Sequence, residues 1–243
     1  MLLDQYADHI AAAITAIRET QREKIIRAAQ MVKAVLVRDG LIYVFGCGHS
    51  HILAEETFYR AGGLANVAPV FYEPLMLHQG AAESSRLEKQ PGLVREVLKN
   101  CPATKNDIFF CLSTSGVNAV PVEAAEIIHS RGIPTVAICS SAYFDQNARS
   151  ASGKHLYEVS DLWIDNKAPH GDACLLPQGA AIKTTPLSTI TGAFILNSIL
   201  AEATQLALAE GVDVPIYLSG NIPGGAERNK ALIDRFSPRI QSL

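Results

Sequence analysis

The sequence carries little net charge and no organised cysteine motif. Its 243 residues include 21 basic and 24 acidic side chains, so the formal net charge of −3 gives no general attraction to nucleic acid or to an anionic membrane. The five cysteines are scattered, odd in number and without a Cys-x-x-Cys pair. We therefore expect a reducing, cytoplasmic environment and no nucleic-acid partner.

The N-terminal residues, MLLDQYADHI, lack a basic region followed by an apolar run. We expect no signal peptide, no apolar segment long enough to span a bilayer, and no membrane partner. No HxxxH or HxxE spacing on one helix face joins the candidate ligands His49, His51, Glu56, His78 and His170, so we also expect no metal and no cofactor. With 48% hydrophobic residues, the chain has enough apolar side chains for a substantial core.

A first strand-to-helix turn follows residues 41–45, LIYVF, an apolar run that stops at Gly46-Cys47-Gly48. A helical pattern begins at once, and Ser50 is placed to cap it. Such a turn directs backbone N–H groups and the positive end of the helix toward one point, which suits an anion such as phosphate. The alternative is a tight turn that holds no ligand.

A second turn has the same design. The buried strand predicted at residues 108–112 runs into Ser113-Thr114-Ser115-Gly116, and a helix follows. Three hydroxyls and free amides match the several acceptor oxygens of a phosphate, although an ordinary helix cap would use the same residue types. In a parallel sheet the two turns can meet at one ligand.

The rest of the chain alternates helices and strands. Residues 4–38 contain no Pro or Gly and predict one or two helices, with a break near residues 21–24. Further strands are predicted at 66–71, 134–139 and 161–164, and helices at 93–98, 119–131, 188–210 and 229–235. Residues 84–91 are interpreted as polar and mobile, and residues 166–185 as loop. The pattern predicts a parallel sheet covered on both faces.

These motifs resemble those of the sugar isomerase (SIS) domain family. Gly46-Cys47-Gly48-His49-Ser50 resembles the G-x-G-x-S turn of the family, and the segment Ser113-Thr114-Ser115-Gly116 is similar to the S-T-S-G loop of phosphoheptose isomerases. The resemblance implies an α/β fold with a flavodoxin-like, doubly wound, five-stranded parallel sheet. It also implies a single SIS domain over residues 1–243, with an N-terminal helical arm at 1–38 and an α/β core at 39–243.

The resemblance further implies a sugar-phosphate ligand and its contacts. Carried over position by position, the residues that would hold the phosphate are Ser50, Ser113, Thr114, Ser115 and Asn118. Ser188 would line the sugar, and Gly48 and His49 lie within the first turn. Asn118 departs from the Ser or Thr usual at its position, but its amide still offers a donor.

The catalytic positions of the family match less well. Where phosphoheptose isomerases carry a Glu and a His, this chain has Arg60 and Glu56, and Ile222 replaces a His found in arabinose 5-phosphate isomerases. A base is needed to take the C2 proton of the sugar. Our candidates are Glu56, His78 and Glu55, of which at most one of the adjacent glutamates can face the site.

We therefore expect a sugar-phosphate isomerase that transfers a proton at C2. The alternatives are a non-catalytic phosphosugar-binding module and an etherase or deaminase acting on an amino-sugar phosphate. A dinucleotide-binding fold would need a third Gly where this chain has His51. The apolar seam from Leu3 to Ile17 and the helix at 188–210 predict a homodimer or a larger homo-oligomer, in which His170 or Asn221 would reach the pocket of a neighbour.

Overall fold

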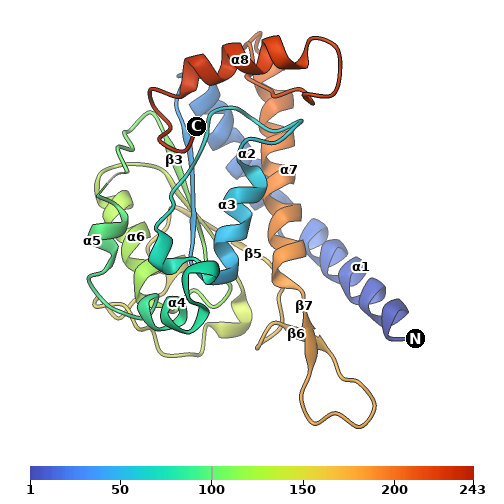
Figure 1. Cartoon of the computed structure of the whole chain (residues 1–243). Coiled ribbons are helices and arrows are strands. Elements are labelled where there is room, and N and C mark those ends of the chain that lie inside the picture. Colours follow the sequence, from blue (N-terminus) through green and yellow to red (C-terminus); the bar gives the residue numbers. More distant parts are fainter. Residues whose placement is uncertain (100) are drawn as a thin grey trace.

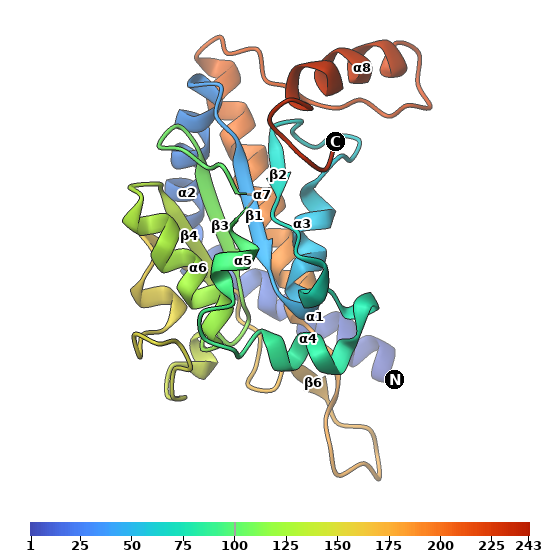
Figure 2. The same cartoon turned by 60° about the vertical axis from the view of Figure 1, so that its left-hand side comes forward.

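Five short apolar strands form one parallel sheet (Figures 1 and 2). The computed structural model describes residues 1–99 and 101–243. The strands are β1 (Ile42–Gly46), β2 (Val67–Pro69), β3 (Ile108–Leu112), β4 (Thr135–Cys139) and β5 (Leu162–Asp165). Their order is β2-β1-β3-β4-β5, so the winding reverses between β1 and β3, where flavodoxin-like sheets bind ligands. The predicted fold class is confirmed.

Alternate strand residues enter two separate cores, one on each face of the sheet. In β1, Ile42 and Val44 join one core, and Tyr43 and Phe45 join the other. This alternation follows from the period of two along a strand, and burial on both faces explains why the strands are almost wholly apolar in sequence.

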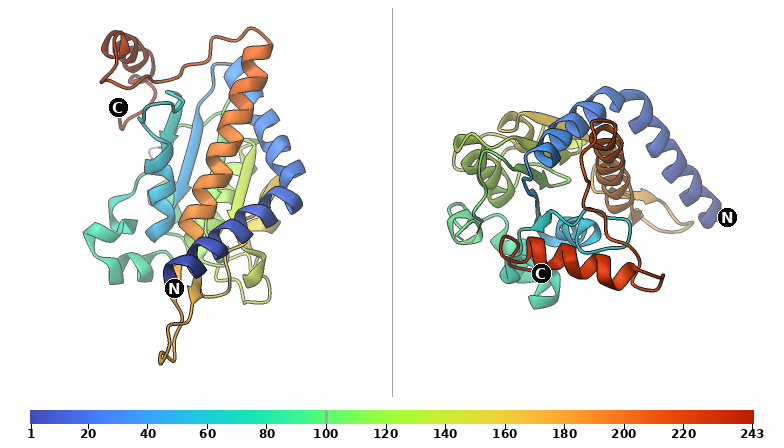
Figure 3. Two further views of the ribbon diagram at one scale, coloured as in Figure 1. Left: turned by 90° about the vertical axis from the view of Figure 1, so that its right-hand side faces the viewer. Right: turned by 90° about the horizontal axis from the view of Figure 1, so that it is seen from above.

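Helices cover both faces. One core receives side chains of α2 (Arg22–Val37), α3 (Ile52–Thr57) and α7 (Ser188–Ala209). The other receives side chains of α5 (Val94–Val97), α6 (Ala119–Ser130) and α8 (Gly225–Phe236). Helix α7 lies alongside α2 (Figure 3).

The N-terminal helix α1 (Leu2–Thr20) extends from the body of the molecule as an arm (Figures 1 and 3). It buries only Ala13 and Ile17, and its last turn closes with the amide of Gln21 donating to the carbonyl of Ile17. The break predicted near residues 21–24 is confirmed, because α2 begins at Arg22.

Two predictions of irregular structure are wrong. Residues 84–91, interpreted as mobile, include the end of α4 (Ala81–Leu87), where Ser84 is fully buried and its hydroxyl donates to the carbonyl of Leu75. Residues 166–185, interpreted as loop, include most of an antiparallel hairpin of β6 (Ala173–Leu175) and β7 (Thr184–Pro186). Its loop projects from the domain (Figure 1).

Helix α7 also corrects the prediction that no segment could span a bilayer. An 18-residue window of this 22-residue helix reaches a mean hydropathy of 1.3 and passes that test by length and composition alone. Eight of its residues are buried in this structure, and the helix packs against α2, α3 and α1. Its apolar character is therefore explained by its place in the fold.

Candidate functional site

The turns after β1 and β3 open into one cavity of about 370 Å³ at the carboxyl edge of the sheet. All eight residues predicted to bind substrate line it, namely Gly48, His49, Ser50, Ser113, Thr114, Ser115, Asn118 and Ser188. They come from segments up to 140 residues apart, so the fold alone brings them together. The volume is within the range of small-ligand sites.

The first turn is fixed by close packing of its backbone. A Cβ at Gly46 would lie 2.6 Å from the carbonyl carbon of Ser50, so only glycine fits there. The amide of Ser50 donates to the carbonyl of Cys47 at 3.0 Å, within the 3-10 turn Gly48–His51. The prediction that Ser50 caps the next helix is wrong, because α3 begins at Ile52 after His51, with no side-chain cap.

The second turn leaves hydrogen-bond donors open. The hydroxyl oxygen of Ser113 accepts from the amide of Gly116 at 3.2 Å, and Gly116 has a φ of +64°. The amides of Thr114 and Ser115 have no hydrogen-bond partner among the residues that the structure describes. Successive free amides beside a left-handed glycine form the concave arrangement that binds anions.

Asn118 holds a carboxylate in the cavity wall. Its Nδ2 donates to Oε1 of Glu88 at 2.7 Å, and its Oδ1 accepts from Arg149 at 2.5 Å. Burial raises the pKa of Glu88, and the positive charges of Lys89 and Arg149 oppose that rise. Sequence reasoning missed Glu88, which lies in the stretch interpreted as mobile. No spacing in that stretch marks it, and only the position of α4 brings it to the site.

Asp172 and Ser188 form the opposite wall. Asp172 accepts from the amides of Leu187 and Ser188, at 3.1 and 2.8 Å, and from the hydroxyl of Ser188 at 2.6 Å. The N-cap is Leu187, and the side chain of Asp172, at the base of the β6–β7 hairpin, satisfies the first amides of the helix.

The turn after β4 adds Tyr143 to the lining. Its hydroxyl accepts from the amide of Gly171 at 2.8 Å, its ring stacks on His170, and burial raises the pKa of its phenol. The next residue, Phe144, stacks on Tyr157 with ring centroids 4.0 Å apart and meets Trp163 edge-on at 5.1 Å. This aromatic cluster fixes one wall of the site.

The three residues predicted as catalytic lie outside the lining of this cavity. Glu56 pairs with Arg60 one turn further along the chain, and Glu55 lies 3.3 Å from His51 one turn before it. His78 is exposed, and its neighbour Leu77 is the residue that reaches the cavity. The structure does not bring these three side chains together with the phosphate turns, and their catalytic role stays a prediction.

Cys47 also lines the cavity, but burial raises the pKa of its thiol well above the usual value. It is therefore protonated near neutral pH and a poor nucleophile. Within the described part of the chain, no group of three or more His, Cys, Asp or Glu side chains is placed to hold a metal ion.

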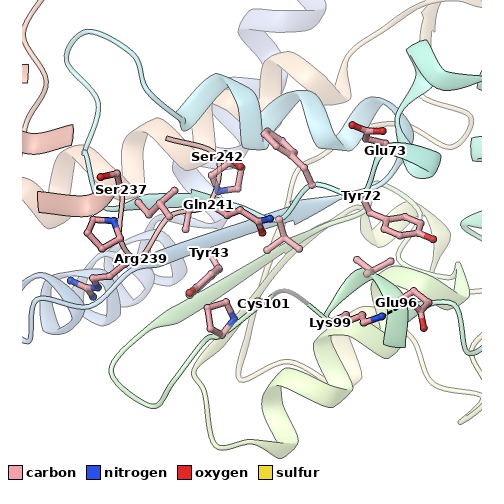
Figure 4. A pocket seen from close by; sticks show the side chains of 18 residues that line it. Tyr43, Tyr72, Glu73, Glu96, Lys99, Cys101, Ser237, Arg239, Gln241 and Ser242 are labelled. Atoms are coloured by element: carbon pink, nitrogen blue, oxygen red, sulfur yellow. Dashed lines mark ion pairs between the residues drawn. The ribbon is translucent and has the colours of Figure 1, made fainter. Parts of the chain in front are cut away.

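A larger cavity, of about 920 Å³, lies elsewhere, beside β2 and the C-terminal tail (Figure 4). Its lining includes Tyr43, Glu96, Lys99 and Arg239, and no residue of the two strand-to-helix turns. Glu96 and Lys99 pair loosely at 3.9 Å, and Arg239 is already bound to Asp39. Volume alone therefore does not mark the site, because the convergent donors are in the smaller cavity.

A sequence profile of the SIS domain matches residues 5–140, from α1 to the end of β4. This chain belongs to the SIS domain family. The matched span includes both strand-to-helix turns, so the SIS profile and the cavity coincide at the same residues.

Relatives with 40% identity or more match this chain over its whole length. A UPF0309 protein of Geobacillus thermodenitrificans is 43% identical over 243 residues, which is 100% of this chain and 98% of the relative. A UPF0309 protein of Brucella anthropi is 40% identical over 242 residues, covering 100% of this chain and 99% of the relative.

Solved structures share the SIS fold at low identity. The phosphoheptose isomerase GmhA of Neisseria gonorrhoeae is 17% identical with a TM-score of 0.51, covering 85% of this chain and 99% of that one. A phosphoheptose isomerase of Francisella tularensis is 15% identical with a TM-score of 0.53, covering 84% and 99%. A third structure, Escherichia coli CFT073 c3406 in complex with a sugar phosphate, is 14% identical with a TM-score of 0.50, covering 87% and 90%.

Proposed function

We propose that this protein binds a phosphorylated sugar in the cavity between the two turns and isomerises it by proton transfer at C2. The observation that carries the proposal is the convergence of open amides and hydroxyls at one edge of the sheet. Ser113, Thr114 and Ser115 line the cavity and carry hydroxyls, and the amides of Thr114 and Ser115 have no hydrogen-bond partner among the described residues. Donors arranged in this way favour the several acceptor oxygens of a phosphate.

The remaining lining residues suit the sugar. Ser50 and His49 extend the donor set from the first turn, and Ser188 offers a hydroxyl on the opposite wall. Since the net charge of the chain is −3, attraction to the phosphate must come from this local arrangement. Neighbours of the same fold that act on phosphoheptoses or hold a sugar phosphate support the choice of ligand class.

A second candidate is a non-catalytic phosphosugar-binding module. It is favoured by the position of Glu55, Glu56 and His78, because none of these sequence-predicted bases lines the cavity. In this case the protein would bind the sugar phosphate and leave it unchanged.

Two measurements test the proposal. Thermal shift with hexose, heptose and amino-sugar phosphates should raise the melting temperature, and the same sugars without phosphate should not. Solvent deuterium should then enter C2 of a bound aldose phosphate if the protein is an isomerase. Equal stabilisation by phosphorylated and free sugars would refute phosphosugar binding, and binding without exchange would favour the module.

We also propose a homodimer. The α1 arm exposes Leu2 and Leu3 and buries only two of its residues, which leaves its outer face without a partner in one chain. Closed symmetric dimers are the commonest way to cover such a surface. Light scattering should give a mass of at least twice 26.1 kDa, whereas a monomer at micromolar concentration would contradict this arrangement.

A further inference from the structure

Two carboxylates line the cavity, and they differ in how many hydrogen bonds they already accept from the protein. Asp172 accepts three hydrogen bonds from the start of α7. Glu88 accepts one, from Asn118 to Oε1, and its Oε2 has no partner within residues 1–99 and 101–243. Glu88 is therefore the lining carboxylate that retains an oxygen for a ligand.

The main chain also holds Glu88 in place. Its amide donates to the carbonyl of Ser84 at 3.0 Å, at the end of α4. Its carbonyl accepts from the amide of Val120 at 3.0 Å, in the first turn of α6. The main chain of Glu88 is thus hydrogen-bonded to α4 on one side and to α6, the helix after the second turn, on the other. Its carboxylate is therefore positioned before any ligand arrives.

This arrangement explains why the chain has Asn118. A Ser or Thr hydroxyl at this position would donate and accept through one oxygen close to the main chain, whereas the longer Asn amide uses two separate atoms. Asn118 bridges a carboxylate and a guanidinium in this way, because its Nδ2 contacts Glu88 and its Oδ1 contacts Arg149. The main chain of Arg149 is held next to this loop, since its amide donates to the carbonyl of Val117 at 2.8 Å.

We propose that Glu88 is the base of the isomerisation, and that Asn118, held by Arg149, is its positioning residue. This inference rests on the proposed function. The carboxylate of Glu88 takes the proton from C2 of the aldose, and the electron pair of the broken C–H bond forms the C1=C2 double bond. The π bond between C1 and O1 breaks at the same time, its electron pair moves to O1, and the product is an enediolate. A second proton moves from O2 to O1, the electron pair left on O2 forms the C2=O bond, and the C1=C2 pair takes the proton from Glu88 at C1. The aldose becomes a ketose with no oxidant or reductant.

The surroundings of Glu88 suit a base at neutral pH. Burial raises its pKa, so its conjugate acid holds a proton more firmly than a solvated carboxyl does. The ionisable groups nearby are Lys89 on its own segment, Arg149 beyond Asn118 and the protonated thiol of Cys47. Three more line the same cavity, namely His49, Tyr143 and Asp172.

The test uses the full-length protein and three aldose probes, glucose 6-phosphate, arabinose 5-phosphate and glucosamine 6-phosphate. The probe that stabilises the wild type most is incubated in D₂O, and label at C2 is followed by NMR. Glu88→Gln should keep the thermal shift and lower the exchange rate by about 10²–10⁴-fold, the usual contribution of a general base. Glu88→Asp should recover part of the rate.

Glu83→Gln is the matched control, because Glu83 lies on α4, at whose end Glu88 stands, is exposed and, within residues 1–99 and 101–243, pairs only with Arg86. It should exchange at the wild-type rate. Exchange by Glu88→Gln at the wild-type rate would overturn the assignment of the base. So would a wild type that binds a probe without exchanging label. If no probe stabilises the wild type, the proposed function fails first and this inference falls with it.

Asn118→Ala tests whether Asn118 acts by positioning the carboxylate of Glu88 or only supports the fold. Removing the donor to Oε1 withdraws stabilisation from the carboxylate and raises the pKa of Glu88 further. The acid limb of kcat/KM should therefore move to higher pH, and this displacement of the pH profile is separate from any loss of affinity for the probe. An unchanged limb with a uniformly lower rate would show that Asn118 does not act through Glu88.

Discussion

The two turns that build the cavity look alike in sequence but differ in how they are held. In the first, Gly46 is demanded by backbone contact with Ser50, and the Ser50 amide is already bonded to Cys47. In the second, Gly116 is demanded by its φ of +64°, and the neighbouring amides of Thr114 and Ser115 remain open. The first turn therefore contributes mainly shape, and the second contributes most of the unused donors.

The largest expected effect comes from the contact at the first turn. Gly46→Ala would place a methyl group 2.6 Å from backbone atoms of Ser50, and the cost of such overpacking is about 3 kcal/mol. Urea unfolding should show this loss. Gly220→Ala, at a glycine with open space and no positive φ, is the control and should stay within about 0.5 kcal/mol. A stable Gly46→Ala variant would show that the first turn is adaptable.

Next in size is the loss of the left-handed residue in the second turn. Gly116→Ala should cost about 1–2 kcal/mol of stability and also abolish the thermal shift with sugar phosphate, because the free amides would be redirected. Gly179→Ala imposes similar strain at φ +82° in the open hairpin loop, so it should lose stability and keep the thermal shift. Equal thermal shifts in the two variants would show that binding does not depend on the backbone conformation of the second turn.

Two serine substitutions, one in each turn, compare how much the turns contribute to the binding of a sugar phosphate. Ser115→Ala should weaken sugar-phosphate binding by about 1–2 kcal/mol, as expected for a lost hydrogen bond to a charged group, and Ser50→Ala by about 0.5–1 kcal/mol. Isothermal titration measures both, with the exposed Ser130→Ala on α6 as the control. A larger loss of affinity in Ser50→Ala than in Ser115→Ala would show that the first turn, and not the second, supplies the main donors to the phosphate.

The smallest effect concerns the carboxylate beside the second turn. Since burial raises the pKa of Glu88 above its unfolded value, ionisation costs more in the folded state, and the wild type should lose stability as pH rises from about 4.3 through the raised pKa. Glu88→Gln has no carboxylate to ionise, so this loss of stability should be absent in the variant. Urea unfolding at pH 4 and pH 8 should show the variant gaining on the wild type at the higher pH only. A constant difference would mean that Glu88 is not desolvated.

The sheet and the two turns could be predicted because they rest on local signals. The strands at residues 41–45 and 108–112 were predicted within one residue, since each is an apolar run ended by glycine or serine. The β6–β7 hairpin escaped prediction because three-residue strands give no readable alternation.

The catalytic side of the site could not be predicted in the same way. Glu55 and Glu56 lie near the first turn in sequence, but their side chains meet partners one turn away along the chain. Glu88 lies 30 residues before Asn118, and only the packing of α4 against the rest of the fold places the two side chains 2.7 Å apart. Distance along the chain carries no information about that contact.

The chain has a single tryptophan, Trp163, and its surroundings make it an optical reporter of the cavity. The ammonium group of Lys24 lies 3.4 Å from its ring centroid, and Phe144 meets its edge next to the cavity residue Tyr143. Because the emission of an indole responds to nearby charge and ring contacts, a ligand that shifts the Tyr143 turn should change the fluorescence of the unlabelled protein. Occupancy of the site can then be followed in real time, without a coupled assay or a chosen reaction.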